Sequence, residues 1–204
     1  MYDVISMKST IEEALSKAEA EVRTIFAKAL RNIYSANKVP NETTFGNVTI
    51  CKHTLRAHSD LDDITGAAGF YIILTDYPIE NNNCMLSGHE NLRAIYRGEC
   101  GTIRKRIQSH LFNTQYKEDY ECRKTDYKNS EKGKGKEFYE PFWPACLKPE
   151  PGVNGIDIDN EKYKNSEWLV IVHSMKGSSQ EVRQQAELAF DEVFGKPVAC
   201  RERV

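Results

Sequence analysis

The N-terminal part of the chain shows the apolar spacing of a helix. Ser9 and Glu12 match a capping box, in which two side chains satisfy backbone amides at a helix start. Behind this box apolar residues recur in alternating steps of four and three, at Ile11, Leu15, Ala18, Val22, Ile25 and Ala29. The pattern predicts a helix from about residue 10 to 36 with one apolar stripe. Such a stripe suits docking on the helix's own domain, and pairing with a partner's helix is the alternative.

Three segments have the apolar, β-rich character of strands. The stretches "GFYIILTDYP" at 69–78 and "EWLVIVHSM" at 167–175 are too short and too rich in strand formers for helices. Residues 94–97 predict a third, shorter strand, and polar residues 78–91 predict a loop before it. Alternating polarity in "TFGNVTICKHTL" at 44–55 predicts a further strand or hairpin arm.

Two more helices follow from the same kind of pattern. One spans about residues 102–113, with an apolar residue at every fourth position. The other begins at a second capping box, Ser178 with Glu181, and ends at Gly195 and Pro197. Both helices directly follow predicted strands.

The central order of strand, strand, helix, strand and helix predicts an α/β (α+β) fold. We expect a small, mixed, three-stranded sheet flanked by helices. Residues 1–60 form an N-terminal helix and β-arm extension, and residues 61–204 form the main domain. The segment at about 114–165, rich in charge, proline and glycine, is expected to be an insertion in that domain.

Composition narrows the class of protein. The chain has 204 residues, 40% of them hydrophobic and 28% charged, which is typical of a globular protein. No apolar run approaches the ~20 residues that cross a bilayer, and the charged N-terminus does not resemble a signal peptide, so we expect a cytoplasmic protein without a membrane partner. A net charge of −2 argues against non-specific coating of nucleic acid. The basic stretch 123–136 is interpreted as a solvated loop.

The cysteines and histidines do not predict a structural zinc site. None of the six cysteines forms a CxxC pair, and the five histidines lack the spacing of a zinc finger. Reduced thiols are therefore expected.

Two strand tyrosines are the first candidates for chemistry. Side chains alternate across a strand, so Tyr71 and Tyr96 can share one face if their strands pair. Gly98, two positions beyond Tyr96, removes a side chain from that face and lets a ligand approach. The alternative is that both tyrosines are half-buried packing residues.

The following helix and the last helix carry charged candidates. Arg106 and His110 lie one turn apart, and a guanidinium suits a phosphate oxygen while an imidazole exchanges protons near neutral pH. The alternative for the basic run Arg104, Lys105 and Arg106 is a solvated helix face. Glu187 borders an apolar stripe, where it could pair with Arg183 or serve as a single oxygen ligand for Mg²⁺.

Together these motifs resemble the GIY-YIG nuclease family. "GFY" at 69–71 and "YRG" at 96–98 are followed by Arg106, His110 and then Glu187 ahead of "KP", over roughly residues 66–200. The resemblance implies a metal-dependent endonuclease that hydrolyses phosphodiester bonds of DNA, with Mg²⁺ or Mn²⁺ as cofactor. The N-terminal helix and the long insertions are similar to stand-alone restriction-type members, which implies a homodimer through that helix.

The resemblance also assigns roles to residues. Tyr71 or Tyr96, with His110 or water, would deprotonate the attacking water, and Arg106 would bind the scissile phosphate. We expect nearby cations to lower the phenol pKa for this task. Glu187 would hold the metal.

The remaining candidates would contact the substrate. Gly98 would provide clearance for it, and Arg104 and Lys105 would lie beside it. In the second motif, Arg97 replaces an aliphatic residue and Glu99 replaces the frequent lysine, so Arg97 is a candidate for the missing cation.

Two other classes of function compete with the nuclease. A non-catalytic module that binds nucleic acid or a protein partner on the same scaffold is the first, with Glu99 as the sign of a lost active site. A cysteine nucleophile at Cys100 with His110 is disfavoured, because ten helical residues span roughly 15 Å.

Overall fold

A computed structural model describes residues 4–35, 42–45, 48–89, 91–139, 147, 149–150, 152–153 and 155–200. Its helices are α1 (Val4–Tyr34), the 3₁₀ helix η1 (His58–Asp63), α2 (Ile103–Leu111), α3 (Asn113–Asn129) and α4 (Gln180–Phe194). Its strands are β1 (Glu42–Phe45), β2 (Val48–Thr54), β3 (Gly69–Thr75), β4 (Arg93–Cys100) and β5 (Trp168–Ser174). Within these residues no helix is both long and apolar enough to traverse a membrane.

The strands form one sheet in the order β1-β2-β5-β3-β4, and every neighbouring pair is antiparallel. The α+β class is therefore confirmed, but the expected mixed, three-stranded sheet is wrong in both strand number and direction. The difference arises because the predicted β-arm is a hairpin whose β2 pairs with β5. The sheet consequently runs across the boundary that we drew between residues 60 and 61.

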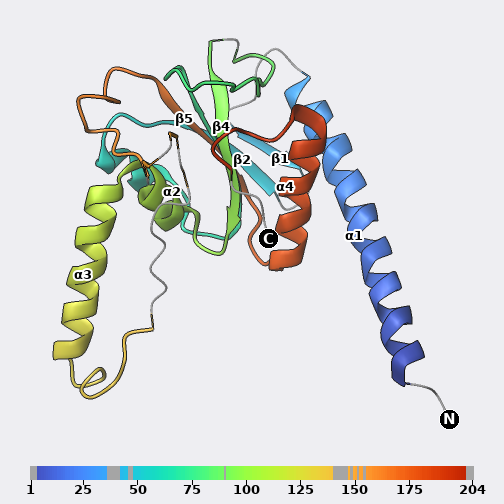
Figure 1. Ribbon diagram of the computed structural model, residues 1–204, viewed down its shortest axis with the longest axis horizontal. Helices are drawn as coiled ribbons and strands as arrows, with labels where there is room; N and C mark the ends of the chain where they lie inside the picture. Colours follow the sequence, from blue (N-terminus) through green and yellow to red (C-terminus); the bar gives the residue numbers. More distant parts are fainter. Residues whose placement is uncertain are drawn as a thin grey trace.

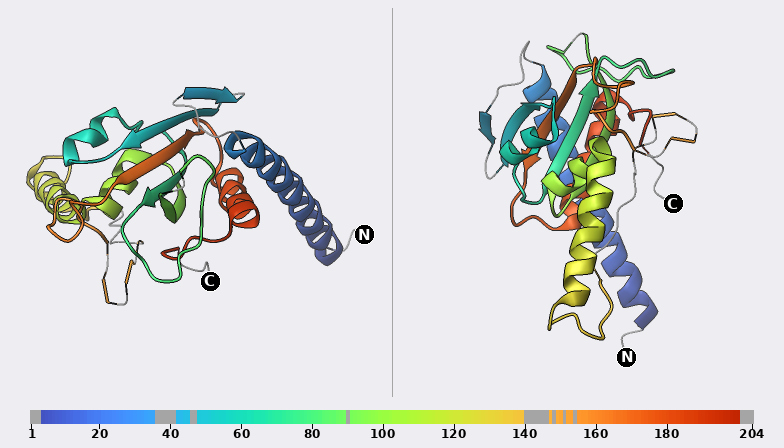
Figure 2. Two further views of the ribbon diagram at one scale, coloured as in Figure 1. Left: turned by 90° about the horizontal axis from the view of Figure 1, so that it is seen from above. Right: turned by 90° about the vertical axis from the view of Figure 1, so that its left-hand side faces the viewer.

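The two faces of the sheet are covered by different helices (Figures 1 and 2). Alternate residues of β3 point to opposite faces, so Tyr71 and Ile73 pack with α2 while Phe70 and Ile72 pack with α4. Helix α1 lies outside α4 and contacts it along its C-terminal half. The end of α1 also reaches the sheet, because the Tyr34 hydroxyl lies 2.7 Å from Nε2 of His173 in β5. One face of the sheet is therefore covered by α2, and the other by α4 with the end of α1.

Helix α1 differs from its prediction in both start and packing. It begins at or before Val4, so Ser9 lies inside the helix and the predicted capping box does not mark its start. Residues near its C-terminal end, Ala27, Leu30 and Tyr34, are buried. The predicted stripe is not what docks, since the side chains of Ile11, Leu15 and Ile25 are 52%, 59% and 64% exposed.

The predicted insertion contains a helix that the apolar pattern did not show. Helix α3 occupies 17 residues, including the first part of the basic stretch expected to be a loop. Its buried aromatic residues are Tyr116 and Tyr120, and Tyr127 adds a ring contact with Phe138. In Figure 1, α3 and α1 project past the sheet in the same direction, on opposite flanks of the molecule.

Helix α4 leads into a segment that covers the edge strand β4 of the sheet. Ser179, one residue beyond the predicted cap, accepts a hydrogen bond from the amide of Val182, and Gly195 ends α4 as expected. Residues 199 and 200 then run along the outer side of β4, where the amide of Ala199 donates to the carbonyl of Ile95 at 3.0 Å. Strand β4 is therefore shielded although it is the last strand of the sheet.

Candidate functional site

Tyr71, Tyr96 and His110 form an aromatic cluster under α2. The register places Tyr71 opposite Gly98 and Ile73 opposite Tyr96, so both tyrosines lie on the same face. The Tyr71 hydroxyl lies 2.8 Å from Nε2 of His110, and both side chains are completely buried. The ring of Tyr96 stacks on Tyr71 at 6.1 Å and lies 4.5 Å from the ring of His110. Two strands and a helix thus bring three of the predicted residues into contact.

Gly98 provides clearance for a side chain of the protein itself. A Cβ atom at Gly98 would lie 2.5 Å from the Tyr71 hydroxyl oxygen. The space that we expected a ligand to enter is filled by the phenol. The glycine of the first motif is similar, since a Cβ at Gly69 would lie 2.2 Å from the carbonyl oxygen of His173. Both motif glycines allow close packing of the sheet.

The protein environment shifts the pKa values of Tyr71 and His110 away from pH 7. Burial raises the pKa of Tyr71 well above its ordinary value, and the opposing effect of the Arg106 charge is smaller. Burial, followed by the charge of Arg106, lowers the pKa of His110 well below its ordinary value. The expectation that cations lower the phenol pKa is therefore wrong for Tyr71, because desolvation outweighs them. At neutral pH the pair consists of a neutral phenol and a neutral imidazole.

His110 retains one polar atom without a protein partner. Within the described residues, Nδ1 of His110 is buried and accepts or donates no hydrogen bond. The direction of the Tyr71–His110 bond depends on which ring nitrogen carries the proton. A neutral imidazole in this position can pass a proton between its two nitrogens.

Arg106 lies beside this cluster and lines a pocket. The pocket has a volume of about 260 Å³ and lies where β4 ends and α2 and α4 begin. Its lining residues are Glu99, Cys100, Gly101, Arg106, Gln180 and Arg183. Two guanidinium groups from different helices therefore border one cavity.

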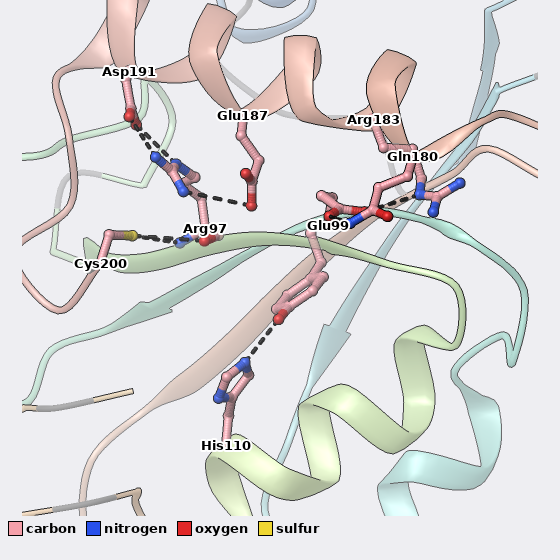
Figure 3. A network of polar contacts seen from close by, with 9 residues as sticks. Arg97, Glu99, His110, Gln180, Arg183, Glu187, Asp191 and Cys200 are labelled. Atoms are coloured by element: carbon pink, nitrogen blue, oxygen red, sulfur yellow. Dashed lines mark hydrogen bonds and ion pairs between the residues drawn. The ribbon is translucent and has the colours of Figure 1, made fainter. Parts of the chain in front are cut away.

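Glu187 lies on the other side of β4 from the tyrosines. Arg97 and Glu99 are opposite Ile72 and Phe70 in the sheet, so their side chains point toward α4. Oε1 of Glu187 is 3.5 Å from Nη1 of Arg97. Figure 3 shows this pair on one side of the strand and His110 on the other. The predicted meeting of all five catalytic candidates around one point is not what the structure shows.

Arg97 is held between carboxylates of α4. Its Nε donates to Oδ1 of Asp191 at 2.9 Å, and its Nη2 donates to Oδ2 at 2.5 Å. Its side chain is 9% exposed and that of Glu187 is 5% exposed. Arg97 therefore connects β4 to α4 through ion pairs. It does not lie where we expected a cation that contacts the substrate.

A second ion pair joins β4 to α4 at the pocket. Nε of Arg183 donates to Oε2 of Glu99 at 3.1 Å, and Nε2 of Gln180 donates to the other carboxylate oxygen at 3.2 Å. Arg183 was considered as a partner of Glu187, but it pairs with Glu99 instead. Arg183 precedes Glu187 by four residues, and this spacing predicts that the two residues share a helix face.

The neighbouring cations of α2 have different surroundings. Nε of Arg104 donates to the carbonyl of Ile64 at 2.8 Å, and its Nη2 donates to that of Asp62 at 2.7 Å. Arg104 therefore connects α2 to the end of η1 and the residues after it, rather than reaching toward the pocket. Lys105 is partly exposed on α2, and its role as a phosphate contact stays a prediction.

The residues present suit a divalent metal only in part. Mg²⁺ is commonly held by one or two carboxylates, with water and substrate phosphate as its other ligands. Glu187 can supply one such oxygen, although Arg97 already offsets its charge. The described residues contain no group of three or more His, Cys, Asp or Glu side chains arranged to hold a metal ion. A metal at Glu187 would therefore need further ligands from the substrate phosphate and water.

A cysteine nucleophile is not supported by the pocket. Burial raises the pKa of Cys100 to about 12, so its sulfur is a neutral thiol at physiological pH. The other cysteines in the described residues, at 51, 84, 122 and 200, are also free, in agreement with the expectation of reduced thiols.

Comparisons with protein-family models, with curated proteins and with solved structures found no match to this chain. The resemblance to GIY-YIG nucleases therefore rests on the sequence motifs alone.

Proposed function

We propose that this protein is a metal-dependent DNA endonuclease that hydrolyses phosphodiester bonds with a GIY-YIG-type site. The observation that supports this best is the position of Arg106. It lines the pocket at the end of β4, and its charge acts on both Tyr71 and His110. A guanidinium next to a proton-exchanging pair is what attack of water on a phosphodiester needs.

Each residue has a defined task in this proposal. Arg106 binds the scissile phosphate in the pocket and stabilises the negative charge that grows on its oxygens. The hydroxyl of Tyr71 and the neutral imidazole of His110 hold and move the proton that the attacking water loses. Tyr96, which stacks on Tyr71, keeps the two rings in place and is the second candidate to contact that water.

The metal would be held by Glu187, with Mg²⁺ or Mn²⁺ as the ion. When bound, it would supply positive charge for the oxygen that leaves phosphorus. Because Glu187 lies across β4 from the phenols, the substrate has to reach around the end of this strand. The pocket, which residues of both α2 and α4 line, lies at that end of β4, and Glu187 is not among its lining residues.

A second candidate function is a module that binds nucleic acid without cutting it. The observation in its favour is that burial keeps the Tyr71 phenol protonated while Glu187 faces Arg97. In that case the pocket and its arginines would hold a phosphate, and no water would be activated.

The test is cleavage of supercoiled plasmid by the purified chain with Mg²⁺, with Mn²⁺ or with EDTA. We expect nicked and linear products only with metal. Arg106→Ala and Glu187→Ala should each reduce the rate by about 10²–10³-fold, the loss typical for removal of one charge-stabilising group. Arg31→Ala, which removes a surface cation on α1, is the matched control and should cut at the normal rate.

Two results would contradict the endonuclease. Retention of plasmid in a mobility assay without any cleavage would support the binding module. Cleavage that persists in both variants would point to a contaminating nuclease.

A further inference from the structure

Glu99 is an unusual residue in the pocket at the end of β4. The cavity is bordered by two cationic side chains, Arg106 and Arg183, and by the Glu99 carboxylate, which is 6% exposed. A buried carboxylate needs compensation of its charge, and Arg183 provides it. The pocket as a whole therefore carries one positive charge more than negative.

Arg183 is held in a fixed orientation at the pocket. Nη1 of Arg183 donates to the carbonyl of Ser178 at 2.6 Å, while Nε donates to Glu99 at 3.1 Å. The side chain is 9% exposed, so these contacts limit its movement. A guanidinium held in this way presents its fork of donors to an anion without first losing rotamer freedom.

Carboxylate and phosphodiester are alternative partners for the same guanidinium. A carboxylate is planar and a phosphodiester is tetrahedral, but each has two terminal oxygens that accept parallel hydrogen bonds from arginine. In this structure Oε2 of Glu99 occupies part of that place by accepting from Nε of Arg183, while Oε1 accepts from Gln180 (Figure 3). Gln180, which donates to the other oxygen of Glu99, is exposed at the rim of the pocket.

We infer that Arg183 is a second phosphate-binding residue of the site and that Glu99 competes internally with the substrate phosphate for it. This inference rests on the proposed function and adds a form of regulation to the same pocket. A bound phosphodiester displaces the Glu99 carboxylate from Arg183 and leaves Arg183 and Arg106 on the same phosphate group. The exchange involves ion pairs alone, so no covalent bond or proton transfer is required.

The test compares three single variants and one double variant with the native chain. Glu99→Gln keeps an oxygen that accepts from Arg183 but removes the competing charge. Gln180→Ala removes the hydrogen bond from Gln180 to Glu99, at an exposed position. Glu181→Gln makes the same charge change at an exposed site on the first turn of α4, outside the pocket, and is the matched control.

Binding is measured by fluorescence anisotropy of a labelled DNA duplex in EDTA, so that cleavage does not interfere. Glu99→Gln should bind about tenfold more tightly than Glu181→Gln, the effect of one charge-assisted hydrogen bond. Gln180→Ala should bind more tightly than the native chain by a smaller factor. In the double variant Glu99→Gln/Arg183→Lys the gain should disappear, because lysine keeps the charge but lacks the fork.

The outcomes separate this inference from the proposed function. If the native chain cuts plasmid and Glu99→Gln binds no better than Glu181→Gln, internal competition is wrong and the endonuclease stands. If Glu99→Gln/Arg183→Lys keeps the gain in affinity, Glu99 does not compete with the substrate phosphate for Arg183. If neither the native chain nor any variant binds or cuts DNA, both proposals fail. Thermal unfolding of each variant verifies that the compared proteins are folded.

Discussion

The hydroxyl of Tyr71 and Nε2 of His110 lie 2.8 Å apart, and neither side chain is accessible to solvent. Tyr71 comes from the centre of the sheet and His110 from the last turn of α2, so this bond connects the two layers. Both groups are neutral at physiological pH because burial disfavours their charged forms.

Replacement of Tyr71 by Phe should destabilise the fold. The ring is retained, but Nε2 of His110 is left in the core without a hydrogen bond, which costs about 1–3 kcal/mol. Urea denaturation at pH 7.5 measures the free energy of unfolding. Tyr77→Phe is the control, since the Tyr77 hydroxyl contacts Glu150 near the surface and water can replace it. Equal losses in the two variants would contradict a special role for the buried bond.

Replacement of Gly98 by Ala should displace the Tyr71 phenol. The new methyl group would lie 2.5 Å from the hydroxyl oxygen, and overpacking of this kind costs about 1–3 kcal/mol. The cost should shrink in a Tyr71→Leu background, which removes the two nearest atoms and leaves Cε1 of Tyr96 at 2.9 Å. Gly101→Ala is the control, because no atom lies within 4 Å of its added Cβ. The measurement is a double-mutant cycle of unfolding free energies, and purely additive values would contradict the contact.

Replacement of Arg97 by Met should be among the most damaging single changes. It would leave the buried carboxylate of Glu187 and the half-buried carboxylate of Asp191 without their cation, and the typical cost is about 3–5 kcal/mol. Arg31→Met is a matched control, because Arg31 and Glu192 are also 3.5 Å apart but are 56% and 53% exposed. That surface pair should contribute less than ~1 kcal/mol. Chemical denaturation compares the two, and similar losses would contradict the distinction.

Stability should fall as the pH drops below the ordinary range of histidine. Burial lowers the pKa of His173, next to the Tyr34 hydroxyl, from 6.5 to about 4. The unfolded chain takes up this proton near pH 6.5 while the folded chain resists it. The contribution of His173 is therefore complete above pH 6.5 and is lost as the pH falls to about 4, a change of ~3 kcal/mol.

The variant His173→Gln isolates this effect from the titration of carboxylates. The difference in unfolding free energy between the native chain and the variant should decrease between pH 7 and pH 4. A difference that is constant with pH would show that His173 does not titrate on unfolding. His110 shifts in the same direction and should add to the slope of both proteins.

The exposed stripe of α1 leads to a prediction about assembly. Ile11, Leu15 and Ile25 are exposed on α1, at steps that suit a coiled coil. We propose that a second copy of the chain covers them. Size-exclusion chromatography with light scattering should give a dimer, and Ile11→Glu/Leu15→Glu should give a monomer of unchanged melting temperature. A monomeric native chain would contradict the proposal.

The sequence predicted individual strands better than the way in which the strands pair. Strands β3 and β5 were visible because they are buried on both faces and read as continuous apolar runs. The pairing of β2 with β5 joins residues more than a hundred positions apart, and no local pattern encodes it. Helix α3 was missed because it is largely charged and has no apolar stripe to detect.

The candidate site was predictable as a set of residues but not as an arrangement. Alternation along the strands correctly placed Tyr71 and Tyr96 on one face. The helical step predicted only that His110 lies one turn from Arg106, and the family resemblance grouped His110 with the tyrosines that it contacts. Glu187 borders an apolar stripe, and such a position looks the same in sequence whether the carboxylate faces a ligand or an arginine. Burial of Tyr71, which decides its pKa, depends on contacts from three separate elements.

The ion pairs between β4 and α4 also determine how the helix is aligned on the strand. Arg97 meets Glu187 and Asp191, whereas Glu99 meets Arg183, one helical turn earlier. Slippage of the helix by one turn in one direction would place Glu187 beside Glu99, and slippage in the other would place Arg183 beside Arg97. Like charges would then face each other in a buried interface, so charge alternation excludes both misaligned forms.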